Sequence, residues 1–300
     1  MIEIRGKKNH PFTPLNGMSF FDPEKEVSSI DILTLNNIFC VVSKRRRGEL
    51  EKVSEINSKR KIDIPIVREF RTMVGFHCVV SGPLLCQYDA TVASILLALY
   101  FELDGSNGNL VCNYSDIAEK LYGKRHPSGK LKDDISRSLT RLKGCNIQIM
   151  DDDSDEFIWQ KSIIKDLSTN GKKSRGFKFI IELNEYFVPA LKKQQFSLQG
   201  ILELISLSGE YQPALYRLVT SSEHHYVELS LDDLYCLVTE KGSTSKNGFF
   251  RLESTTKSYF KKNIANSIEG LKKRNILTSE SKICGDTVIL KKVLCETKGQ

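Results

Sequence analysis

The chain has 300 residues, of which 40% are hydrophobic, 27% charged and 9% aromatic, as is typical of a globular protein. Its 44 Lys and Arg residues outnumber 37 Asp and Glu residues, which gives a formal net charge of +7 and argues against acidic or disordered classes. No stretch reaches the roughly 18 apolar residues of a membrane span, and residues 1–12 lack the apolar core of a secretory signal. We therefore expect a cytoplasmic protein of two domains, not a membrane or secreted protein.

Eight cysteines are spread along the chain, and no two are closer than eight positions. The sequence therefore lacks the Cys-x-x-Cys spacing that is typical of zinc and redox sites. In a reducing cytosol such residues act as small buried hydrophobes, and we expect neither a metal nor another cofactor.

Residues 1–83 are expected to form an N-terminal extension. Its basic middle, residues 44–61, holds eight basic and three acidic groups and predicts a surface arm, a helix or both. Two β-prone stretches, 62–67 and 76–80, lie near its end. An arm of this charge attracts polyanions.

Residues 84–196 are expected to contain three helices, two short strands and a hairpin. Asp89 begins the first helix, and Ser115 is expected to cap the second. The third is basic and carries apolar residues at i, i+4, i+8 and i+11, the stripe of a helix packed along one face. The predicted ranges are helices 89–103, 116–122 and 130–144, strands 110–112 and 146–150, and hairpin arms 156–164 and 177–183 around the loop 168–176.

Residues 197–300 repeat this order at an offset of about 129 residues. Ser230 is expected to cap the second helix of this set. The predicted ranges are helices 211–221, 231–238 and 255–274, strand 227–229, a β-prone stretch 275–277, and hairpin arms 276–279 and 287–293. Seven residues recur unchanged in the two basic helices and their exits, at 132, 135, 138, 142, 143, 146 and 147 and again 129 positions later.

Helix, strand, helix, helix and a two-stranded wing is the order of a winged-helix domain, and the chain contains it twice. The sequence thus predicts an α+β fold with two tandem winged-helix domains, 84–196 and 197–300, behind the N-terminal extension. The positive charge follows the repeat, because 123–143, 165–178 and 255–274 carry +5, +4 and +5. Together with residues 44–61, these segments carry a net charge of +19, so the remaining residues carry −12. Positive charge concentrated in a few segments indicates a polyanionic partner.

In a helix-turn-helix domain the second helix of the motif enters the major groove and contacts base edges. With its apolar stripe inward, the helix 255–274 turns a polar set outward. This set contains Ser258, Tyr259, Lys262, Asn263, Asn266, Glu269 and Lys273, with Lys261 on the flank. An Asn side chain can make a bidentate hydrogen bond with adenine, and a Lys side chain can contact guanine or a phosphate. The alternative is an ordinary solvated amphipathic helix.

The first basic helix is a weaker candidate for base reading. It is expected to turn Lys130, Asp133, Asp134, Arg137, Thr140 and Arg141 outward. Its two acids repel phosphates, while Arg137 and Arg141 attract them. Lys172, Lys173 and Arg175 in the following loop are a plausible clamp on the DNA backbone.

Residues 211–222 (YQPALYRLVTSS), 227–238 (VELSLDDLYCLV) and 256–276 resemble the second winged helix of iteron-type plasmid replication initiators, and residues 89–149 resemble the first. The resemblance implies binding of origin repeats by monomers, with base reading by Lys262, Asn263 and Asn266. It also implies a first domain that contacts DNA and forms a homodimer interface in many members.

We therefore predict a non-enzymatic, sequence-specific double-stranded DNA-binding initiator in the bacterial cytoplasm, associated with the nucleoid or a plasmid, that recruits host replication proteins. The main alternative is a tandem winged-helix transcriptional regulator. More distant alternatives are a rolling-circle nicking enzyme and a protein-interaction module. We also predict that residues 1–60 are dispensable for specificity but add affinity at low salt.

Overall fold

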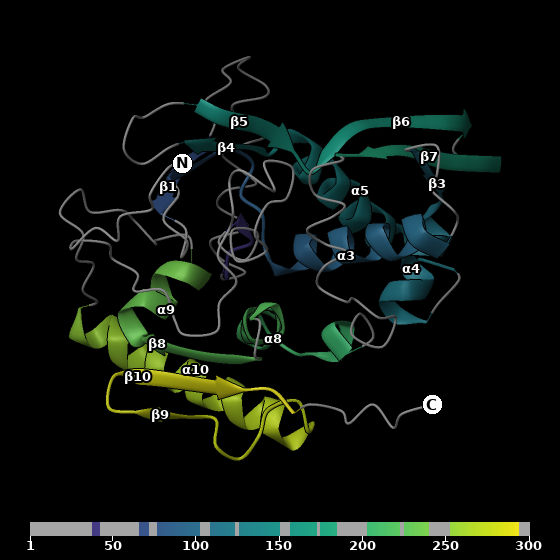
Figure 1. Ribbon diagram of the computed structural model, residues 1–300. Coiled ribbons are helices and arrows are strands. Elements are labelled where there is room, and N and C mark those ends of the chain that lie inside the picture. The colour runs from purple at the N-terminus through teal and green to yellow at the C-terminus, as the bar shows by residue number, and fades with distance from the viewer. Residues whose placement is uncertain are drawn as a thin grey trace, which may run out of the picture.

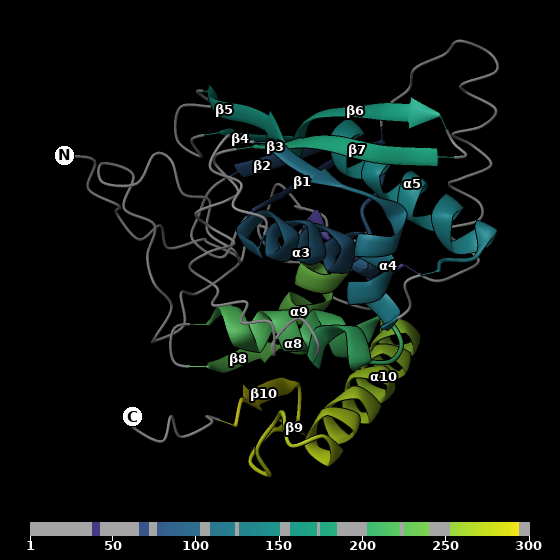
Figure 2. The same cartoon turned by 90° about the vertical axis from the view of Figure 1, so that its right-hand side faces the viewer.

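The computed structural model describes residues 38–42, 66–71, 77–102, 109–123, 126–150, 157–172, 175–184, 203–222, 225–239 and 253–293 (Figure 1). Within these ranges the chain is an α+β protein with two stacked units, the first in blue and teal and the second in green and yellow (Figures 1 and 2). No helix of the described ranges has both the length and the apolar character needed to cross a membrane.

The first unit is a winged helix, as predicted. Its elements are α3 (Gln87–Glu102), β3 (Asn109–Cys112), α4 (Tyr114–Tyr122), α5 (Gly129–Gly144), β6 (Ile164–Lys172) and β7 (Arg175–Leu183). β7 pairs antiparallel with both β3 and β6, so the hairpin closes onto the strand between the first two helices. The apolar stripes of the helices pack beneath this sheet in one core.

The cap of α4 differs from the prediction. Asn113, not Ser115, begins the helix: its Oδ1 accepts the backbone N–H groups of Ser115 at 2.7 Å and Asp116 at 3.1 Å. The Asp116 carboxylate accepts the Asn113 N–H at 2.7 Å, which completes a capping box. The prediction of Ser115 is wrong because Asn and Ser both suit an N-cap, and their order alone does not choose between them.

The second unit is also a winged helix. Its elements are α8 (Tyr211–Ser221), β8 (Tyr226–Ser230), α9 (Leu231–Val238), α10 (Ser254–Lys273), β9 (Lys282–Cys284) and β10 (Thr287–Lys291), with strand order β8-β10-β9. Ser230 caps α9 as predicted, because its Oγ accepts the Asp233 N–H at 3.0 Å. Gly285 has a φ of +59°, the left-handed conformation that suits the tight turn between β9 and β10.

A second sheet of the first unit corrects two predictions. It consists of β1 (Ile66–Arg71), β2 (His77–Gly82), β4 (Asn146–Met150) and β5 (Phe157–Ser162), in the order β1-β2-β4-β5. β5 was expected to be a wing arm, but it pairs with β4, and the wing arms are β6 and β7. β1 and β2 come from the expected N-terminal extension and complete this sheet. Alternation along a strand predicts its faces but not its partner.

The arms of the second wing also differ from the prediction. Residues 276–279 were expected to form the first arm, whereas β9 begins at Lys282. The β-prone stretch 275–277 contributes one isolated bridge, between Leu277 and Lys292. Asn275 has a φ of +56°, which ends the helix and prevents a regular strand at that point.

Residues 38–42 lie between the two units and contact both. Ile38 and Phe39 belong to the core of the first unit, and Val41 packs against the core of the second. The Cys40 N–H donates to Leu85 O at 2.9 Å, and the Val41 N–H donates to Val238 O at 2.6 Å. Residues 38–42 therefore pack as part of both units, which corrects their placement in a separate N-terminal extension. That residues 1–60 are dispensable for specific binding stays a prediction. The basic stretch 44–61 lies outside the described residues.

Five of the cysteines are buried as predicted, namely Cys40, Cys78, Cys86, Cys112 and Cys145. Cys236 is half-buried, whereas Cys284 on β9 is exposed and corrects the expectation for that residue. Burial raises the pKa of Cys112 and Cys145 to about 12, so these thiols stay protonated and inert at neutral pH. Cys295 lies outside the described residues.

Candidate nucleic-acid interface

The outer face of α10 carries most of the predicted base-reading residues. Its inner face is apolar as expected, because Phe260, Ile264, Ile268 and Leu271 are each at most 2% exposed. The opposite face exposes the predicted residues Ser258, Lys262, Asn266 and Lys273. Asn263 and Lys261 are half-buried at the borders of this face. α10 lies at the edge of the molecule, away from the sheets of the first unit (Figures 1 and 2).

One flank of α10 is tied to the turn between β9 and β10. The Lys261 ammonium donates to Gly285 O at 2.6 Å, and the Lys257 ammonium lies 2.7 Å from the Asp286 carboxylate. Lys257 also lies 3.4 Å from Asp232 at the start of α9. Hydrogen bonding to Asp286 raises the pKa of Lys257, which keeps this contact charged. Lys261 therefore supports the wing in this structure, and its predicted DNA contact requires release from Gly285.

The basic residues on and beside the outer face of α10 differ in whether they contact other side chains. Lys272 pairs with Glu269 at 2.9 Å, and Arg274 donates to the Ser206 hydroxyl at 3.0 Å. Lys262 and Lys273 make no ion pair or hydrogen bond with any other described residue and are exposed. Ammonium groups without internal partners are available to phosphates and base edges at little cost.

The outer face of α5 is more mixed in charge. Lys130, Asp133, Arg137 and Thr140 are exposed as predicted, and Asp134 is half-buried. Ser128 begins this helix, its Oγ accepting the Leu131 N–H at 3.3 Å. The basic residues of α5 therefore share their surface with Asp133 and Asp134 in the second turn, and these acids weaken the attraction of phosphates to that part of the helix.

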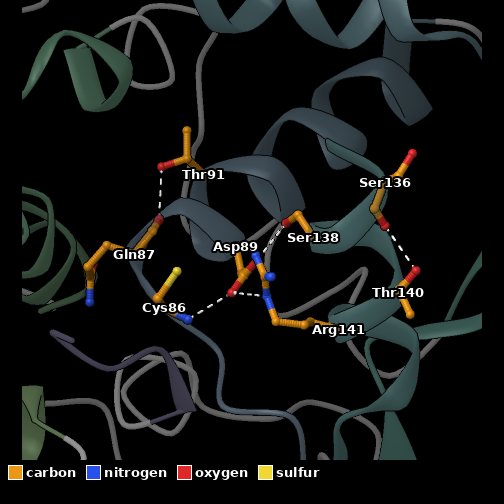
Figure 3. Close-up of polar contacts among 8 residues, drawn as sticks. All are labelled: Cys86, Gln87, Asp89, Thr91, Ser136, Ser138, Thr140 and Arg141. Carbon is orange, nitrogen blue, oxygen red and sulfur yellow. Dashed lines mark hydrogen bonds and ion pairs between the residues drawn. The ribbon is translucent and has the colours of Figure 1, made fainter. Parts of the chain in front are cut away.

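Arg141 does not face outward, which corrects its expected orientation. Its guanidinium reaches Asp89 at the start of α3, with Nη2–Oδ1 at 2.8 Å, and Asp89 is fully buried (Figure 3). Asp89 also accepts the Ser138 hydroxyl at 2.6 Å and the Cys86 N–H at 2.8 Å. This network ties α3 to α5, so Arg141 holds the fold together here, and its predicted DNA contact stays a prediction that this pairing disfavours.

The sequence analysis predicted Asp89 only as the first residue of a helix and did not predict that its buried carboxylate pairs with Arg141. The signal lay in Ser138 and Arg141, two polar residues three positions apart beside an apolar stripe. A helix places such residues on one side, but the acid they meet lies about 50 residues away in the sequence.

The predicted clamp of the first wing lies at the tip of its hairpin. Lys172 ends β6 and pairs in register with Arg175, which begins β7. Lys173 lies outside the described residues. Backbone pairing thus brings Lys172 and Arg175 to the same end of the wing.

No metal centre is found among the described residues, which hold no group of three or more His, Cys, Asp or Glu side chains able to bind an ion. The Asp-rich stretch 151–155 lies outside them, between the paired strands β4 and β5.

The fold is similar to solved structures of RctB. A crystal structure of domains 2 and 3 of RctB matches with a TM-score of 0.51 and 14% sequence identity, covering 76% of this chain and 91% of the other. Another structure of RctB domains 2–3 covers the same shares at 14% identity with a TM-score of 0.47. No family model matches the chain, and no curated protein matches it. The first likeness supports the tandem α+β architecture.

Proposed function

We propose that the protein is a sequence-specific double-stranded DNA-binding replication initiator, which recognises repeated origin sites and promotes opening of the origin. The observation that carries the proposal is the outer face of α10. It joins an exposed amide, Asn266, to two exposed lysines, Lys262 and Lys273, that have no partner among the described residues, on the helix that winged-helix proteins place in the major groove.

Each group on this face has a defined use. Asn266 has the donor and acceptor needed for a bidentate contact with adenine. Lys262, about one turn nearer the N-terminus, reaches guanine or phosphate, and Lys273 at the C-terminal end anchors the backbone. Together they provide reading and anchoring along one helix.

The first unit supports this face rather than duplicating it. Its Arg137, Lys172, Lys173 and Arg175 are proposed to contact DNA phosphates, and its surface is proposed to form a homodimer contact, as in the family that the sequence resembles. Two winged helices joined through residues 38–42 would cover successive groove segments from a single chain. Distortion of the duplex and recruitment of host replication proteins would complete initiation, with no cofactor and no catalytic step.

The test uses the full chain and a random-sequence duplex library enriched for binding. On the enriched duplex, Asn266→Ala is expected to lose about 1–3 kcal/mol of binding free energy, because a bidentate base contact disappears. Binding to unselected DNA should hardly change, since that rests on phosphate neutralisation.

Lys273→Ala serves as the contrasting variant. It should weaken binding to enriched and unselected DNA alike and reduce the salt slope by about one unit. Lys120→Ala, on α4 and paired with Glu102, is the charge-matched control and should change neither. If Asn266→Ala and Lys273→Ala both bind like the parent chain at moderate salt, α10 is not in the groove and the proposal fails.

Origin activity separates an initiator from a transcriptional regulator. A plasmid that carries the enriched repeats beside an A·T-rich segment should replicate only when the chain is supplied, and that segment should become reactive to permanganate. A regulator would bind the repeats without either effect. Cleavage of supercoiled DNA in the presence of magnesium would instead indicate a nicking enzyme.

A further inference from the structure

An aromatic ring on the outer face of α10, that of Tyr259, is left largely in solvent by the described residues. Tyr259 is 69% exposed, the highest value among the exposed large hydrophobic side chains of the described residues. It makes no hydrogen bond and no ring contact with another described residue. Its neighbour Phe260, in contrast, is buried between the rings of Tyr211 and Tyr235 at 5.8 and 5.0 Å. Packing of α10 therefore uses Phe260 and leaves Tyr259 in solvent.

Tyr259 belongs to the same stripe as the proposed base readers. Thr255, Tyr259, Lys262, Asn266 and Lys273 follow one another at i, i+4, i+7, i+11 and i+18, and all five are exposed. Residues at this spacing share one face of a helix. Tyr259 precedes Asn266 by two turns, about 10 Å along the axis, which corresponds to about three base-pair steps along a strand.

The major groove offers one apolar group to such a ring. Of the four bases, only thymine presents a methyl group at its edge, and side chains that detect thymine do so by apolar contact. An exposed ring gains free energy by removing this methyl group and itself from water. The ring is also held close to the helix by only two torsions, so its ordering costs little.

We propose that Tyr259 is a specificity-determining residue, which packs its ring against the C5-methyl group of a thymine about three base pairs from the base read by Asn266. The inference rests on the proposed function, because α10 must lie in the groove. It adds a second recognised base, a thymine, to the base that Asn266 is proposed to read.

The experiment replaces each thymine of the enriched duplex, one at a time, with deoxyuridine, which lacks only the methyl group. Binding of the full chain is compared with that of Tyr259→Ala and Tyr259→Phe. Loss of one buried methyl contact corresponds to about a four-fold loss of affinity. Tyr122→Ala is the matched control, since Tyr122 is 54% exposed but lies on α4.

The parent chain, Tyr259→Phe and Tyr122→Ala should each lose about four-fold at one particular thymine. Tyr259→Ala should bind the thymine duplex as weakly as the parent binds the deoxyuridine duplex, and should not distinguish the two. Thermal melting checks that Tyr259→Ala is folded. If Tyr259→Ala keeps the parent's response to every deoxyuridine, or if no thymine affects the parent, the inference is overturned while DNA binding by α10 stands. Failure of the proposed function is a different result, in which Asn266→Ala binds the enriched duplex as tightly as the parent chain.

Discussion

The third helices of the two units, α5 and α10, have the same inner face but different outer faces. Ile135 and Leu142 of α5 and their counterparts Ile264 and Leu271 of α10 are all fully buried. Outside, α5 presents acids near its first turn and directs Arg141 into the fold. α10 presents the Asn266 amide together with Lys262 and Lys273, two lysines with no partner in the described part of the chain.

This difference teaches that a repeated core does not require a repeated function. Packing constrains the residues that face α3 or α8, and it leaves the outer face free to vary. In the first unit, polar residues of α5 outside the apolar stripe bind other elements, as Arg141 binds Asp89. In the second unit, the outer face of α10 is exposed. In the proposed function, the first unit would therefore anchor the protein on DNA phosphates and the second would read the bases.

The wings show the same division. β6 and β7 have nine residues each and project beyond the helices of the first unit (Figure 1). β9 and β10 are short, and Lys257 and Lys261 hold their turn against α10. In the proposed function, the long first wing would reach along the duplex, and the short second wing would stay with α10.

The largest expected effect tests whether Arg141 is structural. Arg141→Ala leaves the buried Asp89 carboxylate without its cation, so the free energy of unfolding should fall by about 3–5 kcal/mol. Chemical denaturation measures this. Lys143 lies on the same helix as Arg141 and makes an exposed ion pair with Asp166 of β6, so Lys143→Ala should cost no more than about 1 kcal/mol. Unchanged stability with reduced DNA affinity in Arg141→Ala would instead show that Arg141 contacts DNA directly.

The second prediction concerns the junction between the units. Arg217 on α8 is buried, hydrogen-bonds to Gln87 at the start of α3, and lies 5.9 Å from the centre of the Phe39 ring. Burial lowers its pKa to about 9, so it is still a cation at neutral pH. Arg217→Ala should lower the free energy of unfolding by about 1–3 kcal/mol, because the buried Gln87 Oε1 loses its donor, while Gln87 Nε2 still donates to Phe39 O.

The same variant tests whether the two units unfold together. Loss of the junction should split one denaturation transition into two, since each unit has its own core. Arg274→Ala removes an exposed arginine at the end of α10 and should stay within about 0.5 kcal/mol of the parent. A single unshifted transition in Arg217→Ala would show that other contacts hold the units together.

A third prediction compares neighbouring lysines of α10. Lys262→Ala should lower the salt slope of DNA binding by about one unit, as for a lost phosphate contact. Lys261→Ala should leave the slope unchanged, because its ammonium is engaged by Gly285. Fluorescence anisotropy over a range of salt concentrations measures both. Equal effects would mean that the wing turn releases Lys261 when DNA binds.

The smallest expected effect is a pH dependence located in the second unit. Burial, and then the nearby Lys292, lower the pKa of His225 below its usual value of 6.5. The unfolded chain then binds the proton more readily, so stability is full above pH 6.5 and falls as the pH drops below it. Between pH 7.5 and 5.5 the parent should lose more stability than His225→Asn, in which Asn tolerates the positive φ at this position. Equal losses would contradict the assignment.

The sequence alone determined the local features of both units. The apolar stripes of α5 and α10, the Ser230 cap and the helix α8 are where periodicity and capping predict them. These features depend on residues within one or two turns of each other, so they are visible in a short window of sequence. The exposed positions of Lys262, Asn266 and Lys273 follow from the same periodicity.

Only the tertiary structure decided which distant segments meet. β2 pairs with β4, Arg141 contacts Asp89, and Lys261 contacts Gly285. Residues 38–42 lie between the units and contact both cores. The free energy of each of these contacts depends on a partner that lies between 24 and about 200 residues away in the chain, and no local pattern encodes such a partner.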